Sequence, residues 1–189
     1  MTRTNLIVVS GSTGSGKTTL ARKLGDQLGF PVIYQDALKE VLLDALEPED
    51  RKESQRLGVA SWRMMYSVLD ALIGRVPGVI IESNFVRGRD EQNSLPRIDQ
   101  CETTVLHCTA PWETIEARIR ARESDPARHA GHFDQVALRD AEGLFAAGKY
   151  APTDLPVETV TVDTTDGYAP MLDDLVEIIE RRIEPRLVG

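Results

Sequence analysis

A glycine-rich run near the start of the chain is the feature that most constrains its fold. Residues 11–18 read Gly-Ser-Thr-Gly-Ser-Gly-Lys-Thr, directly after the branched apolar residues 6–9 and directly before a helical pattern of Leu20, Leu24 and Leu28. Glycines let consecutive backbone N–H groups turn inward, and the following helix presents its positive end to the same point. A chance match is expected in under roughly one chain in a hundred. The run predicts a phosphate-binding P-loop.

Each position of this loop has an expected role. Lys17 is expected to reach the β- and γ-phosphates of a nucleotide as a point charge. The Thr18 hydroxyl is expected to ligate a Mg²⁺ ion that bridges those phosphates, and Thr19 is the next candidate, one place off the pattern. The backbone cradle itself is predicted over Gly11, Ser12, Thr13, Gly14, Ser15 and Gly16. The expected cofactors are therefore ATP and Mg²⁺.

Short runs of branched apolar residues alternate with segments of helical period along the whole chain. One such helical segment carries apolar residues from Trp62 to Val76. Parallel neighbouring strands need crossover connections, so this alternation predicts an α/β fold with a parallel sheet and helices on both faces. A ligand site then belongs at the carboxyl ends of the strands. The predicted strands are residues 6–9, 32–34, 79–81, 104–106 and 157–162.

Length and composition narrow the class of protein further. The 189 residues suit one domain, over residues 1–189. No apolar run approaches the ~20 residues that span a bilayer, so we expect a cytoplasmic protein with no membrane partner. The formal net charge of −8 makes nucleic acid a less favoured partner. The cysteines, Cys101 and Cys108, are expected to be reduced and structural.

The chain carries no Asn-Lys-x-Asp sequence, the guanine reader of GTPases, so GTP specificity is disfavoured. A small kinase is the economical hypothesis for a P-loop chain of this length. A kinase needs a group that orients or deprotonates the acceptor hydroxyl. Asp36 is the candidate, because it follows the second predicted strand and opens a helix. The alternative is that Asp36 only caps that helix.

The third predicted strand ends abruptly in polar residues, as Walker B strands do. Glu82 follows four residues of the apolar run and is expected to hold Mg²⁺, directly or through water. Asn84 and Arg87 come next and are predicted to face the acceptor, with a surface cation as the alternative for Arg87. Arg89 and Asp90 resemble ordinary surface residues.

A helix predicted from Pro111 to Arg122 carries several arginines with different expected roles. Arg120 lies one turn after Glu116 and is expected to form a surface ion pair. Arg118 is predicted to contact the nucleotide, and Arg122 to face it. The irregular stretch 123–133 is a candidate lid, from which Arg128 would neutralise charge in the transition state.

The histidines of this region raise the question of a metal site. His129 and His132 lie in the candidate lid, but no four-ligand set occurs at zinc-site spacing. Zinc is therefore not expected. His129 is instead predicted to make hydrogen bonds in the lid or to contact the substrate.

Four segments together resemble small bacterial kinases of the zeta toxin and chloramphenicol phosphotransferase-like group. They are residues 11–18, Gln-Asp-Ala-Leu-Lys-Glu at 35–40, Ile-Glu-Ser-Asn-Phe at 81–85, and Arg118 through Arg-His-Ala-Gly-His-Phe-Asp at 128–134. The resemblance implies a three-layer P-loop core with sheet order 2-3-1-4-5, ATP and Mg²⁺ as cosubstrates, and phosphorylation of a small hydroxyl-bearing molecule. The Asp-Gly-Phe-Pro-Arg of adenylate kinases and the Gly-Arg-Gly-Gly of shikimate kinases do not occur.

Three functional hypotheses follow. The first is a small-molecule kinase in which Lys17, with Arg122 or Arg128, stabilises the transferring phosphoryl group and Asp36 receives the acceptor proton. The second is a polynucleotide 5′-hydroxyl kinase, which needs a basic channel leading to Asp36. The third is a regulatory protein that binds ATP without transferring phosphate. Neither the acceptor nor the oligomeric state follows from the sequence.

Overall fold

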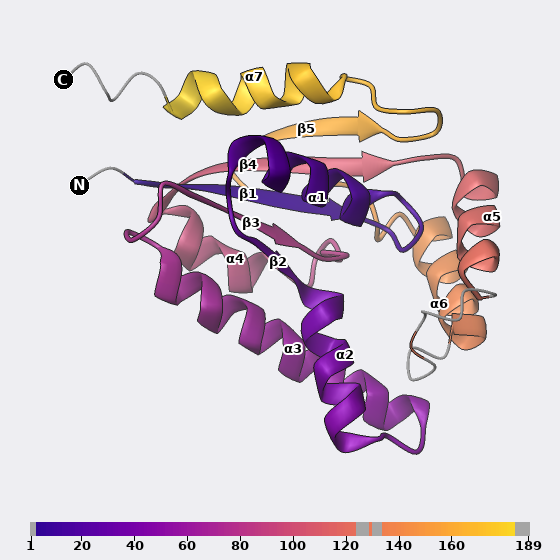
Figure 1. Cartoon of the computed structure of the whole chain (residues 1–189). Helices are drawn as coiled ribbons and strands as arrows, with labels where there is room; N and C mark the ends of the chain where they lie inside the picture. The colour runs from indigo at the N-terminus through magenta and orange to yellow at the C-terminus, as the bar shows by residue number, and fades with distance from the viewer. Residues whose placement is uncertain (1–2, 124–128, 130–133, 184–189) are drawn as a thin grey trace.

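The computed structural model describes residues 3–123, 129 and 134–183 of the chain. Its centre is a five-stranded sheet in the order β2-β3-β1-β4-β5, and every neighbouring pair is parallel (Figure 1). The predicted fold class and sheet order are therefore confirmed. The strands are β1 (Thr4–Gly11), β2 (Val32–Tyr34), β3 (Gly78–Glu82), β4 (Cys101–Thr109) and β5 (Glu158–Asp163).

Helices cover both faces of the sheet (Figure 1). Alternating residues of β1 show why: Ile7 and Val9 point into one core cluster, and Leu6 and Val8 into the other. The first cluster lies between the sheet and the helices α1 and α7, and the second lies between the sheet and the helices α3 and α4. The helices are α1 (Lys17–Leu28), α2 (Gln35–Leu46), α3 (Arg51–Leu72), α4 (Glu91–Ile98), α5 (Trp112–Glu123), α6 (Asp134–Ala146) and α7 (Leu172–Ile183).

The long helix α3 begins well before the apolar pattern that predicted it. Its N-cap is Asp50, whose side chain accepts a hydrogen bond from the backbone N–H of Glu53 at 2.8 Å. The Glu53 carboxylate in turn accepts from the backbone N–H of Glu49. This local capping starts the helix at Arg51, and the chain leaves it at Ile73.

Helices α5 and α6 form a pair beside the carboxyl ends of the strands (Figure 1). Ile115 and Ile119 of α5 form a small core of their own, against which Leu138 and Phe145 of α6 pack. Residues 124–128 and 130–133, which join the two helices, lie outside the described residues, and so does most of the predicted lid. Among the helices that the structure describes, none is long and apolar enough to cross a membrane.

Candidate active site

The glycine-rich loop connects β1 to α1 at the carboxyl edge of the sheet, where the sequence predicts it (Figure 1). Gly14 and Gly16 have φ angles of 80° and 82°, which side chains disfavour. A Cβ atom at Gly14 would also lie 2.9 Å from the carbonyl oxygen of Ile115 in α5. Glycine is therefore required both for the turn and for the close approach of α5.

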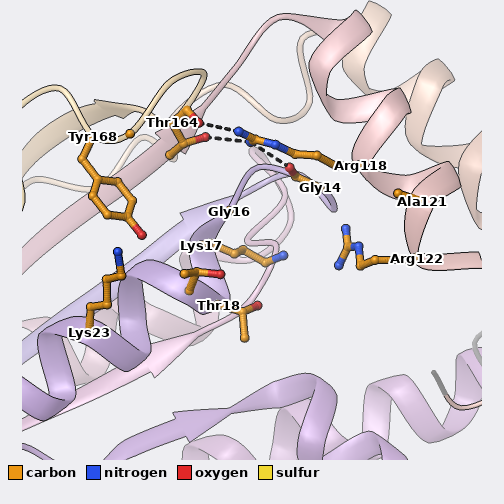
Figure 2. Close-up of a pocket in the computed structure, with 12 residues that line it drawn as sticks. Gly14, Gly16, Lys17, Thr18, Lys23, Arg118, Ala121, Arg122, Thr164 and Tyr168 are labelled. Atoms are coloured by element: carbon orange, nitrogen blue, oxygen red, sulfur yellow. Dashed lines mark hydrogen bonds between the residues drawn. The ribbon is translucent and has the colours of Figure 1, made fainter. Parts of the chain in front are cut away.

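A cavity of about 490 Å³ opens beside this loop, here named the phosphate-loop cavity (Figure 2). Lys17, Thr18 and Thr19 line it from α1, and Tyr168 lines it from the segment after β5. The ammonium of Lys23 lies 5.0 Å from the centre of the Tyr168 ring. The cavity combines a phosphate cradle with a polar-aromatic wall, and its volume lies within the range of ligand pockets.

Arg118 ties the parts of this cavity together. Its guanidinium donates hydrogen bonds to the carbonyl oxygen of Gly14, to the Thr164 hydroxyl and to the Thr164 carbonyl oxygen (Figure 2). The Thr164 hydroxyl donates in turn to the carbonyl oxygen of Ser15 at 2.8 Å. Arg118 thus fixes the phosphate loop against the end of β5 while lining the cavity where the sequence predicts a nucleotide contact.

The other arginines of α5 separate as the helical periodicity predicts. Arg122 lies one turn beyond Arg118, lines the phosphate-loop cavity and points towards the loop (Figure 2). Arg120 points to the surface and donates to the Glu116 carboxylate at 2.6 Å, so the predicted surface ion pair is confirmed. Arg128 lies outside the described residues.

Glu82 lies at the centre of the carboxyl edge. In the sheet register it pairs with Val9 of β1 on one side and with Tyr34 of β2 on the other. Its carboxylate is 3.5 Å from the Lys17 ammonium, and both side chains are buried. Burial raises the pKa of Glu82, the Lys17 ammonium opposes that rise, and the nearby Asp36 carboxylate adds to it.

The group around Glu82 has the donor chemistry that Mg²⁺ prefers. The Thr18 side chain lies close enough to the Glu82 carboxylate to oppose the rise of its pKa, so a hydroxyl and a carboxylate oxygen lie near each other beside the phosphate loop. Among the described residues there is no cluster of three or more histidine, cysteine, aspartate or glutamate side chains that could hold a metal. Mg²⁺ is usually held by one or two protein oxygens together with phosphate and water, and Thr18 and Glu82 are the candidates for those protein oxygens.

Asp36 follows β2 and the phosphate loop follows β1. Because β3 lies between these two strands, Asp36 and the loop lie on opposite sides of Glu82 at the end of β3. It is exposed in the first turn of α2, whose N-cap is Tyr34, so the interpretation of Asp36 as the helix cap is wrong. Asp36 and Asn84 both line a second cavity, of about 610 Å³, enclosed by α2, α3, α4 and the loop after β3. This space is here named the α2–α3 cavity.

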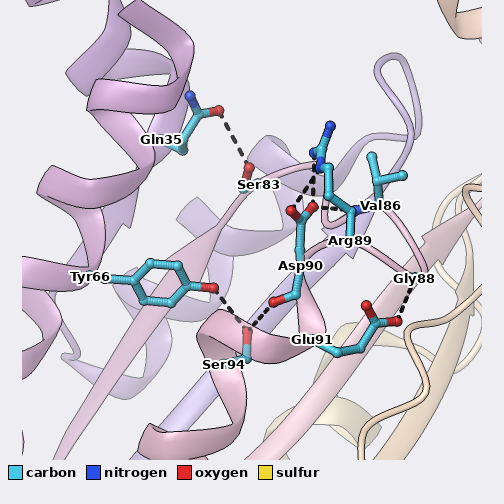
Figure 3. A network of polar contacts seen from close by, with 9 residues as sticks. All are labelled: Gln35, Tyr66, Ser83, Val86, Gly88, Arg89, Asp90, Glu91 and Ser94. Atoms are coloured by element: carbon cyan, nitrogen blue, oxygen red, sulfur yellow. Dashed lines mark hydrogen bonds and ion pairs between the residues drawn. The ribbon is translucent and has the colours of Figure 1, made fainter. Parts of the chain in front are cut away.

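Polar contacts hold the walls of the α2–α3 cavity in place (Figure 3). Gln35 is buried and donates to the Ser61 hydroxyl of α3 at 2.6 Å, and it accepts from the Ser83 hydroxyl at 3.4 Å. The Tyr66 hydroxyl pairs with that of Ser94 at 2.9 Å. These hydrogen bonds connect α2 to α3 and to the loop after β3, and they connect α3 to α4.

The loop after β3 differs from its prediction. Asp90 is buried, with 5% of its surface exposed, and accepts hydrogen bonds from the Val86 backbone N–H and from the Arg89 guanidinium (Figure 3). The prediction of an ordinary surface position is therefore wrong for Asp90. Arg89 lines the α2–α3 cavity, whereas Arg87 is exposed and lies outside its described lining.

His129 also lies outside the described lining of both cavities. Its Nε2 atom is 3.0 Å from the Asp44 carboxylate on α2. The predicted hydrogen bonding of His129 is therefore present, but it is directed to α2. The sequence did not predict the contributions of Arg51, Trp62, Arg63 and Tyr66 to the α2–α3 cavity, or of Lys23 and Tyr168 to the phosphate-loop cavity.

Comparison with known proteins agrees with this fold. The family model described as an AAA domain matches residues 6–145. A solved structure titled as a "putative kinase" from Chloroflexus aurantiacus j-10-fl is 31% identical, covers 96% of this chain and 98% of its own, and superposes with a TM-score of 0.82. No match was found among the curated proteins.

More distant structures share the fold alone. A gluconokinase from Sinorhizobium meliloti 1021 is 16% identical, with a TM-score of 0.54 over 96% of this chain and 94% of its own. A chain of the Pnkp1/Rnl/Hen1 RNA repair complex is 15% identical, with a TM-score of 0.56 over 78% of this chain and 47% of its own. The chain therefore belongs to the AAA domain family matched over residues 6–145 and has the P-loop kinase fold.

Proposed function

We propose that this protein is an ATP-dependent kinase that transfers the γ-phosphoryl group to a hydroxyl of a small molecule. The observation that carries the proposal is the position of Glu82, which lies between Lys17 of the phosphate loop and Asp36 of the α2–α3 cavity. A nucleotide site and a candidate general base thus flank one buried carboxylate. In-line phosphoryl transfer needs a donor and an acceptor on opposite sides of the transferring group.

On the donor side, backbone N–H groups of the loop would bind the phosphates, and Lys17 would neutralise the charge that develops on the transferring group. Arg118 would keep the loop fixed, and Arg122 would supply a second positive charge, as Arg128 would from the lid. Thr18 and Glu82 would hold Mg²⁺, which when bound neutralises phosphate charge.

On the acceptor side, Asp36 would accept the proton of the attacking hydroxyl. Asn84 lines the same cavity and would orient the acceptor by hydrogen bonding. Arg87 and His129 lie outside the described lining, so we assign them no acceptor contact. The chain would act as one domain with a lid at about 123–133, in the cytoplasm where ATP is available.

The narrower resemblance to the zeta toxin and chloramphenicol phosphotransferase-like group is part of this proposal. It rests on the segments 35–40, 81–85 and 128–134, which contain Asp36, Glu82 and Arg128. A polynucleotide 5′-hydroxyl kinase is the second candidate, favoured by the cations of the α2–α3 cavity and by the fold shared with the RNA repair complex.

The test is mass spectrometry of a metabolite extract incubated with the protein, ATP and Mg²⁺. We expect a product heavier by one phosphate, formed by the unaltered protein and absent with Lys17→Ala. A 5′-hydroxyl oligonucleotide is included as a separate acceptor. If the protein binds ATP but no acceptor gains phosphate, the kinase proposal is wrong and an ATP-binding regulatory protein remains.

A further inference from the structure

The charge of the α2–α3 cavity is opposite in sign to that of the whole chain. The protein has a formal net charge of −8. The walls of this cavity nevertheless carry the cations Lys39, Arg51, Arg63 and Arg89 against the anions Asp36 and Asp90, an excess of two positive charges. A cleft whose walls carry an excess of one sign of charge attracts ligands of the other sign.

The arginines of this cavity differ in their partners. Arg89 pairs with the buried Asp90 at 2.8 Å, and Arg51 pairs with Asp140 of α6. Arg63 has no ion-pair partner among the residues that the structure describes, and its side chain is exposed. Arg63 is thus a cavity-lining arginine without an ion-pair partner among the described residues.

Arg63 also lies where the cavity opens to the surface. A shallow groove on α3, with Arg56, Val59 and Ala60, shares Val59 and Arg63 with the α2–α3 cavity. A ligand that reaches Asp36 with one end can therefore place its other end beside Arg63. The groove adds one further cation, Arg56, along the same helix.

The part of α3 that carries Arg63 is held rigidly. The neighbouring Trp62 packs edge-on against Phe85, with ring centres 5.0 Å apart, and against Tyr66 at 5.8 Å. Ser61, the residue before Trp62, accepts a hydrogen bond from the buried Gln35 side chain. The packing of these neighbours holds the backbone of residue 63 in place at the cavity wall.

We propose that the acceptor is a small anionic compound with a free hydroxyl, whose carboxylate or phosphate group pairs with Arg63 while its hydroxyl faces Asp36. This inference rests on the proposed kinase function and names its substrate class. Arginine suits either anion, because its planar guanidinium donates two parallel hydrogen bonds.

A small molecule fits this site better than a nucleic acid. The cavity of about 610 Å³ lies within the range of small-ligand pockets. Proteins that bind nucleic acid often neutralise roughly 6–10 phosphates, more than the excess of two charges and the neighbouring Arg56 can supply.

The first test separates a metabolite extract, freed of polymers by ultrafiltration, into anion-exchange flow-through and retained fractions. Each is incubated with the protein, ATP and Mg²⁺, and phosphorylated products are identified by mass spectrometry. We expect the product from the retained fraction. Product from the flow-through alone, or from a 5′-hydroxyl oligonucleotide alone, would overturn the inference and leave the kinase function intact. If no acceptor gains phosphate, the kinase function itself fails.

Phosphatase treatment of the retained fraction before the assay separates a phosphate acceptor, which is lost, from a carboxylate acceptor, which persists.

The second test uses the acceptor purified from the retained fraction. Arg63→Ala is expected to raise its KM by roughly 10- to 100-fold with a smaller effect on kcat, and Arg63→Lys to restore part of the affinity. The exposed Arg75, outside the described lining of the cavity, gives the matched control Arg75→Ala, which should leave KM unchanged. An unchanged KM in Arg63→Ala would contradict the role of Arg63.

Discussion

The Lys17 ammonium lies 3.5 Å from the Glu82 carboxylate, with both side chains buried. This pair joins the phosphate loop to the end of β3, the strand that lies between β1 and β2. Removal of two charges from water is costly unless they are paired and hydrogen bonded, so a buried pair at a ligand site indicates a functional role. Glu82 also lies near the Thr18 side chain, where the Mg²⁺ ion is proposed to bind.

Glu82→Gln is expected to raise the Mg²⁺ concentration needed for half-maximal nucleotide binding by about 10-fold or more, because the amide keeps the shape but loses the charge that attracts the ion. Calorimetric titration of Mg²⁺ into the protein with a non-hydrolysable ATP analogue measures this without turnover. Glu113→Gln, an exposed change on α5, is the matched control. An identical Mg²⁺ requirement in both variants would remove Glu82 from the metal site.

Arg118→Ala is expected to weaken ATP binding by roughly 10-fold and to lower the free energy of unfolding by about 1–3 kcal/mol. The reason is the loss of charge-assisted hydrogen bonds that hold the phosphate loop to the segment after β5. Nucleotide titration and urea unfolding provide the two measurements.

The same helix supplies the control for Arg118. Arg120 forms an exposed ion pair with Glu116, and such pairs contribute roughly 0.3–0.5 kcal/mol. Arg120→Ala should therefore change neither ATP affinity nor stability by much. Equal effects of the two substitutions would mean that Arg118 does not anchor the loop.

His107 should make stability depend on pH. It is buried on β4 with Nδ1 3.0 Å from the Ser10 hydroxyl, and burial lowers its pKa to about 4, although a hydrogen bond with the Tyr150 backbone opposes the shift. Between about pH 4 and 6.5 the unfolded chain binds a proton that the folded chain excludes. This contribution to stability is complete above the unfolded pKa and is lost as pH falls.

His107→Gln is expected to make the rise of unfolding free energy with pH shallower across that interval, by up to about 1.4 kcal/mol per pH unit. Urea unfolding at several pH values measures the slope, and His129→Gln, a partly exposed change, serves for comparison. If the slope in His107→Gln equals that of the unaltered protein, His107 is not the titrating group.

The sequence predicts the position of the phosphate loop in the fold because the signals for it are local. The phosphate loop is a contiguous motif between a strand and a helix, and the five apolar runs correspond to β1 through β5. The positions of Glu82 and Asp36 are predictable for a related reason: Glu82 ends β3 and Asp36 lies two residues after β2, and the ends of parallel strands meet at one edge of the sheet. The sheet order itself required the resemblance to a known family.

The α2–α3 cavity, our proposed acceptor site, could not be predicted from the sequence because its residues come together only through tertiary packing. Arg63 follows the pattern of a surface cation on an amphipathic helix, and only the packing of α3 beside α2 brings it to the cavity of Asp36. Asp90 is buried because Arg89 and the Val86 backbone satisfy it, which no spacing reveals. The alternation of strands and helices implies a helix before β4, but the sequence did not give the bounds of α4, which is short and contains Pro96.

The most direct test of the account is phosphoryl transfer by Asp36→Asn, measured with γ-labelled ATP and the metabolite extract, alongside ATP affinity in the same preparation. We predict a loss of transfer of roughly 10²- to 10⁴-fold with ATP affinity unchanged, because a general base is removed while the phosphate loop is untouched. Asp26→Asn, an exposed change on α1, should transfer phosphate normally. Transfer by Asp36→Asn at the rate of the unaltered protein would contradict the central claim that the α2–α3 cavity presents the acceptor to Asp36.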